Sequence, residues 1–126
     1  MRRFWLGVGI LVLFLILGLW IGHAMNDVHQ TISQTLDDAA VQSLGGNLSK
    51  GMSLAQEAQQ LWQNNWHGTA SVADHEPMDE IDGLFAQLEV YGKAGAATDF
   101  ATYCARLSRL VSAMGEAHAF TWWNLL

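Results

Sequence analysis

The sequence predicts an all-α protein in which a long N-terminal transmembrane helix continues into a small antiparallel bundle of about four helices. Three observations support this fold class. Residues 4–25 form a long apolar run, the rest of the chain repeats apolar residues at three- and four-residue steps, and no segment alternates apolar with polar residues as a half-buried strand does. Short connections between the helices favour antiparallel neighbours.

The N-terminal run has the length and the flanking residues of a membrane anchor. Its first 19 residues, 4–22, carry no charge, and about 20 helical residues span the hydrocarbon core of a bilayer. Trp5 and Trp20 lie toward the two ends, where indole favours the membrane interface. Two arginines precede the run, and the next basic residue is Lys50. We therefore expect a single-pass plasma-membrane protein with a cytoplasmic N-terminus and an extracytoplasmic C-terminal domain.

The expected organisation is a signal-anchor in residues 1–25 and a helical domain in residues 26–126. The alternative is a signal peptide cleaved after Ala24, because the small residues at positions 22 and 24 resemble a cleavage site. We favour the uncleaved anchor, since its apolar run exceeds the ~7–15 residues usual in signal peptides. Two glycines are spaced so that two membrane helices can approach closely, which leaves a homodimer open. The anchor residues singled out are Phe4, Trp5, Gly18, Trp20 and Gly22.

One long helix is expected over residues 3–44, because no turn signal separates the anchor from the segment that follows it. Apolar residues recur at helical spacing in this helix and in the three after it, and these stripes predict the core. The predicted core residues are Val28, Ile32, Leu36 and Ala39 or Ala40; then Met52, Ala55, Ala58, Leu61 or Trp62, and Trp66; then Met78, Ile81, Leu84 or Phe85, Leu88 and Tyr91; and finally Phe100, Cys104, Leu107, Leu110, Val111, Met114 and His118.

Turn and capping residues set the expected helix boundaries. Glycine-rich segments end the first and third helices, and Asn47 or Ser49 caps the second. Pro77 suits the start of the third helix, and Thr98 can cap the fourth. Gly83 lies inside the third helix at a cost of about 1 kcal/mol relative to alanine, and we expect it to allow close packing there.

The net charge and the absence of known motifs reduce the number of possible functions. The formal net charge is −6, and without the two N-terminal arginines the remainder carries −8. An acidic domain repels phosphate backbones, so no nucleic-acid partner is expected. A single cysteine allows no intramolecular disulfide. The sequence shows no phosphate-binding loop, haem-attachment motif or nucleophile triad, so we expect no cofactor and no enzymatic activity.

Acidic residues crowd the start of the third helix. Carboxylates in a first helical turn complement the helix dipole by about 0.3–1 kcal/mol each, and this is the structural interpretation that we favour. The functional interpretation is a docking patch for a basic partner or a weak site for a divalent cation, although the spacing is not that of an EF-hand. The possible docking residues are Asp74, His75, Glu76, Asp79, Glu80 and Asp82.

No metal site is expected, although a metal-dependent enzyme or metal-binding protein using His75, Glu76 and Asp79 is an alternative. The pair His75-Glu76 does not continue into HExxH, because position 79 is aspartate. A zinc site would need further ligands. His118 and Cys104 are candidates, but both lie on a stripe with the pattern of a core.

The C-terminal end is apolar and uncharged, with Trp122, Trp123, Leu125 and Leu126. We favour a tail that closes the bundle beside Trp62 and Trp66, because small domains rarely expose so much apolar surface. The alternatives are a tail that rests at the membrane interface, where tryptophan is favoured, or one that fills a groove of a partner.

Several of these residues carry a resemblance to a known family. They are Trp62, the pair His75-Glu76, the run Asp79-Glu80-Ile81, Leu84, Leu88 and the ending Asn124-Leu125-Leu126. With the single N-terminal anchor, this pattern resembles the bacterial family catalogued as domain of unknown function 4363. The resemblance implies a membrane helix followed by a helical extracytoplasmic part, and it implies no reaction and no catalytic residue.

The function expected from the sequence is that of a membrane-anchored, non-enzymatic helical interaction module. Its partner would be another membrane or extracytoplasmic protein, and its anchor would contact membrane lipid. A ligand-sensing accessory subunit of a membrane complex is a further alternative. It would need a partner for its output, because the sequence has one apolar run of membrane length.

Overall fold

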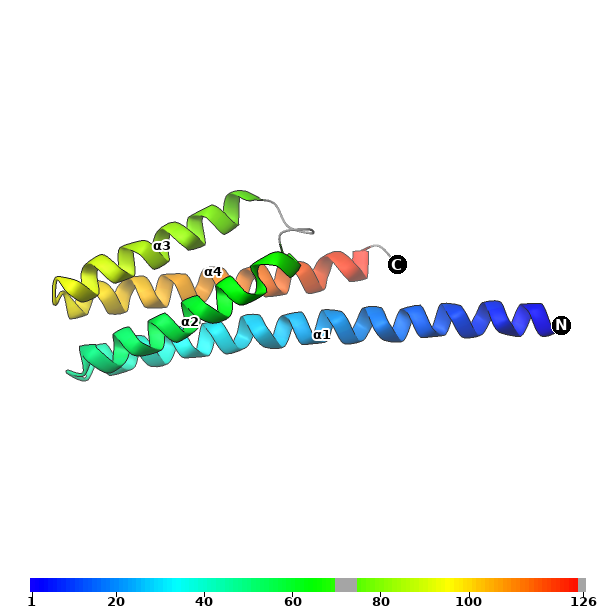
Figure 1. Ribbon diagram of the computed structural model, residues 1–126, viewed down its shortest axis with the longest axis horizontal. Helices are drawn as coiled ribbons and strands as arrows, with labels where there is room; N and C mark the ends of the chain where they lie inside the picture. The colour runs from blue at the N-terminus through cyan, green and yellow to red at the C-terminus, as the bar shows by residue number, and fades with distance from the viewer. Residues whose placement is uncertain (70–74, 125–126) are drawn as a thin grey trace.

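The computed structural model describes residues 1–69 and 75–124, with side chains for all of these except 22, 24–26, 66–69, 75–77 and 117–124. The described backbone forms four helices: α1 (Arg2–Leu44), α2 (Leu48–Thr69), α3 (His75–Lys93) and α4 (Ala97–Asn124). Helices that follow each other in the chain run antiparallel, and α1 extends far beyond the others as a single rod (Figure 1). The predicted fold class, a long apolar first helix that leads into a helical bundle, is confirmed.

Glycines in the left-handed conformation end α1 and α3. Gly46 has φ +90° and Gly95 has φ +73°, a region that favours glycine because it has no Cβ. Beyond Gly46, the Asn47 amide donates to the Gln42 carbonyl at 2.9 Å, and a bond of the same type closes α3 at 3.0 Å. Both predicted glycine stops are therefore confirmed, and both turns lie at the end of the bundle away from the rod (Figure 1).

The helix starts agree with the sequence in part. The Lys50 amide donates to Asn47 Oδ1 at 3.2 Å, so Asn47 is the residue that caps α2. The prediction that Thr98 caps α4 is wrong, because α4 already begins at Ala97. The turn before it brings the Ala96 carbonyl into position to accept the first helical bond, at 2.9 Å from the Phe100 amide.

The core lies where α1 packs against α2 and α4, with α3 covering the remaining side. Each predicted stripe residue with a described side chain is buried or half-buried. Trp66 and His118 lie outside the described side chains. The most deeply buried large residues come from three helices and are Ile32, Leu36, Met78, Ile81, Leu88, Phe100, Leu107 and Val111.

Small residues let α1 and α2 approach closely. A Cβ atom at Gly51 would overlap Ser43 Oγ and would lie 2.9 Å from the Ala39 carbonyl oxygen. Ser43 Oγ itself donates to that carbonyl at 2.7 Å. The prediction of close packing at Gly83 is wrong, because Gly83 faces solvent and no neighbouring atom lies within 4 Å of where its Cβ would be.

Candidate functional site

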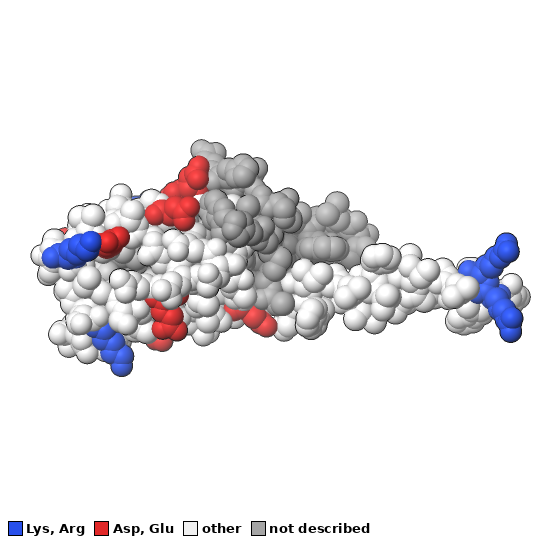
Figure 2. Space-filling model, viewed as in Figure 1, with Lys and Arg blue, Asp and Glu red and all other residues white. Residues whose placement is uncertain are grey.

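The first half of α1 lies outside the bundle. Arg2–Ile21 has a mean hydropathy of 2.6, and 0% of it is buried. By length and composition this segment can cross a membrane. Figure 2 shows basic side chains at the tip of the rod and acidic side chains over the bundle, with an uncharged stretch between them in the part of the molecule drawn in colour.

The predicted anchor residues lie along this rod. Phe4 is 73% exposed, and Trp5 and Trp20 are each 70% exposed. Gly18 is half-buried, and the surroundings of Gly22 lie outside the described residues. Burying a large apolar side chain is worth about 1.5–3 kcal/mol, so a rod of such side chains is strongly driven toward an apolar environment.

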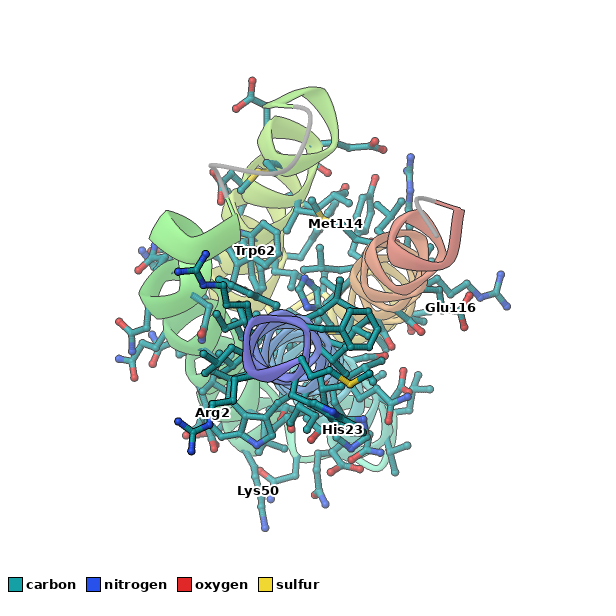
Figure 3. The ribbon with its side chains drawn as sticks, turned by 90° about the vertical axis from the view of Figure 1, so that its right-hand side faces the viewer. Arg2, His23, Lys50, Trp62, Met114 and Glu116 are labelled. Atoms are coloured by element: carbon teal, nitrogen blue, oxygen red, sulfur yellow. The ribbon has the colours of Figure 1, made fainter. Side chains whose placement is uncertain are left out.

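Asp82, from the predicted acidic cluster, is a partner of the core. Trp62 is 2% exposed, and its Nε1–H donates to Asp82 Oδ1 at 3.0 Å. His29 of α1 packs edge-on to the same indole ring, with 6.3 Å between the ring centroids. Figure 3 shows Trp62 reaching from α2 toward the middle of the bundle. Asp82 therefore provides the hydrogen-bond acceptor that a buried indole requires, and it joins α3 to α2.

Two other members of the cluster are exposed. Glu80 Oε1 lies 3.6 Å from Arg106 Nη2 of α4, and both side chains are at least half exposed. An exposed ion pair of this kind is worth about 0–1 kcal/mol. Asp79 is exposed on α3. Asp74 and the side chains of His75 and Glu76 lie outside the described residues, so a docking role for the cluster stays a prediction.

The described residues include no group of three or more His, Cys, Asp or Glu side chains placed to hold a metal ion. Cys104 is fully buried; burial raises the pKa of its thiol to about 12, and the Asp37 carboxylate adds to this effect. A thiol that stays protonated is a poor nucleophile and a poor metal ligand. The alternative site at His75, Glu76 and Asp79 depends on side chains that are not described.

A serine pair that was not predicted joins α1 to α4. Ser33 Oγ lies 2.7 Å from Ser108 Oγ. Each hydroxyl also lies within hydrogen-bonding distance of the carbonyl of the other serine, at 3.2 Å and 3.1 Å. The sequence carries a weak signal for this pair, because each serine directly follows a buried apolar residue, Ile32 or Leu107, and so lies at the edge of an apolar stripe.

A hollow of about 100 Å³ is lined by residues of α2 and α3 and by Phe100 of α4. Its apolar lining includes Phe85, Leu88 and Phe100, and Gln56 and Glu89 add polar groups. The Lys93 ammonium donates to Glu89 Oε1 at 2.7 Å and lowers the pKa of that carboxyl. A hollow of this size holds a few water molecules, at about 30 Å³ each, or one side chain.

Together these features define a class of protein: a helical bundle whose first helix extends into an apolar rod of membrane length. Comparisons with family models, with curated proteins and with solved structures found no match. The resemblance to domain of unknown function 4363 therefore stays a prediction.

Proposed function

We propose that this protein is a membrane-anchored, non-enzymatic interaction module, which presents its acidic bundle to another protein at the outer face of the plasma membrane. The observation that carries the proposal is the continuity of α1. The same unbroken helix forms the exposed apolar rod Arg2–Ile21 and contributes Ile32 and Leu36 to the core of the bundle.

A continuous helix fixes the distance between the membrane and the bundle. At a rise of 1.5 Å per residue, the end of α1 at Leu44 stands about 35 Å beyond the end of the rod at Ile21. Because no turn interrupts α1, the bundle cannot swing freely about a linker. A partner would therefore meet the bundle surface at a set height and in a set orientation.

The charge distribution supports the proposed orientation. The two arginines at the tip of α1 favour a cytoplasmic N-terminus. The remainder of the chain is acidic, so anionic lipid headgroups repel the bundle and leave its sides free for a protein partner. A reporter that is active only outside the cytoplasm, fused after Leu126, should be active, and the N-terminus should stay intact in the membrane fraction. Soluble protein that begins at Met25 would refute the anchor.

The partner is tested by affinity purification of the tagged full-length chain from native membranes in gentle detergent. We expect a protein to co-purify in constant ratio, and recovery of the chain alone would contradict the proposal. Two variants with equal charge change then locate the binding face. One neutralises three carboxylates in the first half of α3 through Asp79→Asn, Glu80→Gln and Asp82→Asn, and the control neutralises Asp37, Asp38 and Glu57 in the same way.

The two variants separate the interpretations of the acidic cluster. Asparagine at position 82 keeps an oxygen that can accept the Trp62 hydrogen bond, so both variants should fold. We expect capture to survive both changes, since Asp82 and Glu80 join α3 to its neighbours. Loss of a salt-sensitive partner from the α3 variant alone would instead identify α3 as the docking face, because salt screens exposed charges within about 10 Å at 0.1 M.

A further inference from the structure

The serine pair fixes the register between α1 and α4. Ser33 lies opposite Ser108, and the two helices run antiparallel (Figure 1). A residue that follows Ser108 by a given number of positions in α4 is therefore level with the residue that precedes Ser33 by the same number in α1. The backbone of α4 continues to Asn124, and the same number of steps before Ser33 reaches Leu17, within the apolar rod. Figure 1 shows the end of α4 beside this part of α1.

Both helices lose their charges at the same level. From the bundle toward the rod, the last charged residue of α1 before the tip is Asp27, and the last charged residue of α4 is Glu116. By the register, Glu116 is level with Met25, which is within one helical turn of Asp27. Glu116 is exposed and points away from the bundle axis in Figure 3, which looks from the end that carries both termini. The two helices thus share one boundary between charged and uncharged sequence.

Both helices carry tryptophan positions just beyond this boundary. Trp20 of α1 is 70% exposed, and the register places the helical positions of Trp122 and Trp123 within one turn of its level. Tryptophan is the residue that the membrane interface favours most clearly. We propose that the end of α4, residues 117–124, enters the interfacial layer of the outer leaflet beside α1, so that the protein contacts the bilayer through two helices.

The last two turns of α4 cross the level at which the rod ends. By the register, residues 117–120 are level with residues 24–21 of α1, and Asn124 lies about 6 Å inside the end of the rod at Ile21, at 1.5 Å per residue. The headgroup region on each side of a bilayer is roughly 5–8 Å thick outside the hydrocarbon core. With the rod spanning that core, the end of α4 crosses the headgroup region and reaches the outer edge of the hydrocarbon, near the level of Trp20.

The register also separates the α4 end from the buried indole on α2. Trp62 packs against His29 of α1, whereas the helical position of Trp122 is level with Leu19. Ten residues of helix, about 15 Å, lie between these two levels. The side chains of the tail lie outside the described residues, so a tail that closes the bundle beside Trp62 and Trp66 stays a prediction, which the experiment below separates from the interfacial arrangement.

This inference rests on the proposed anchor, and its experiment uses the full-length protein reconstituted in phosphatidylcholine–phosphatidylglycerol vesicles. Single cysteines carry an environment-sensitive fluorophore, and half of the vesicles contain lipid with a nitroxide quencher near the headgroup. The native Cys104 gives little background, because it is buried with a raised pKa. The test position is Asn124→Cys. The controls are Trp20→Cys, within one helical turn of the same level on α1, and Ala113→Cys, exposed on α4 on the bundle side of the boundary.

The three positions give outcomes that separate the two proposals. We expect the fluorophore at position 124 to lose as much fluorescence to the nitroxide as the one at position 20, while the one at position 113 keeps its fluorescence. Quenching at position 20 without quenching at position 124 would overturn the inference and leave the anchor standing. A blue-shifted but unquenched fluorophore at position 124 would also overturn it, since protein would then cover the tail. Absence of quenching at all three positions would refute the anchor itself.

Discussion

Replacing Gly51 by alanine tests the close contact between α1 and α2. The new Cβ would overlap Ser43 Oγ and would lie 2.9 Å from the Ala39 carbonyl oxygen. Ser43 can rotate away, but it would then lose its buried bond to that carbonyl, at a net cost of about 0.5–1.5 kcal/mol. The carbonyl oxygen can move only with the backbone of α1, and overpacking of this kind costs about 1–3 kcal/mol.

The opposing gain is smaller. Alanine in place of glycine favours the helix by up to about 1 kcal/mol, so we expect Gly51→Ala to lower the free energy of unfolding by about 1–2 kcal/mol. Gly83→Ala is the matched control. It makes the same chemical change on an exposed face with no atom within 4 Å, and it should raise that free energy by about 0.5–1 kcal/mol.

The assay is denaturant unfolding of the full-length protein in mild detergent, followed by far-UV circular dichroism and tryptophan fluorescence. The two variants should move the transition midpoint in opposite directions. A Gly51→Ala protein as stable as Gly83→Ala would refute the close contact. The double variant Ser43→Ala with Gly51→Ala should recover part of the loss, since it removes the overlapping hydroxyl but leaves the backbone carbonyl in place.

Three further predictions concern the core and its polar partners. Leu88→Ala should lower the free energy of unfolding by about 2–5 kcal/mol because Leu88 is fully buried, whereas Gln87→Ala on the exposed face should have little effect in the same assay. Asp82→Ala should cost about 1–3 kcal/mol because it removes the carboxylate that accepts from the buried Trp62 indole, and Asp79→Ala should be close to neutral. Cys104 should react slowly with iodoacetamide at pH 8 in the folded protein and at the rate of a free thiol once unfolded, because burial holds its pKa near 12 when folded.

The fold could be predicted because it depends on spacing and on local turn chemistry. Apolar residues at three- and four-residue steps identify a buried face whatever its partner is, so the stripes located the core on all four helices. Glycine at a helix end acts through its own backbone, so the stops at Gly46 and Gly95 were also readable. The prediction for Thr98 was wrong because it relied on residue type alone. The start of α4 depends instead on the geometry of the preceding turn.

The contacts between helices could not be predicted from the sequence in this way. Gly51 and Gly83 look alike in the sequence, and only the placement of α1 against α2 makes the first one tight and the second one open. Asp82 was grouped with its acidic neighbours as part of a helix start. Its role toward Trp62, 20 residues earlier in the chain, depends on how α3 lies against α2. The residue types show that the start of α3 is acidic, but only the packing of the helices shows which of these carboxylates contacts the core.

The serine pair relates the bundle to the membrane in the proposed arrangement. Apolar contacts between α1 and α4 are not directional, so several registers would bury similar area. Hydroxyls left without partners cost about 1–3 kcal/mol each, so a slip that separates Ser33 from Ser108 is disfavoured on both helices. A slip of one turn would also move the end of α4 by about 5.4 Å along α1, close to the thickness of the interfacial layer. If α4 enters the interface as proposed, this one polar contact inside the bundle sets the depth that the helical positions of Trp122 and Trp123 reach.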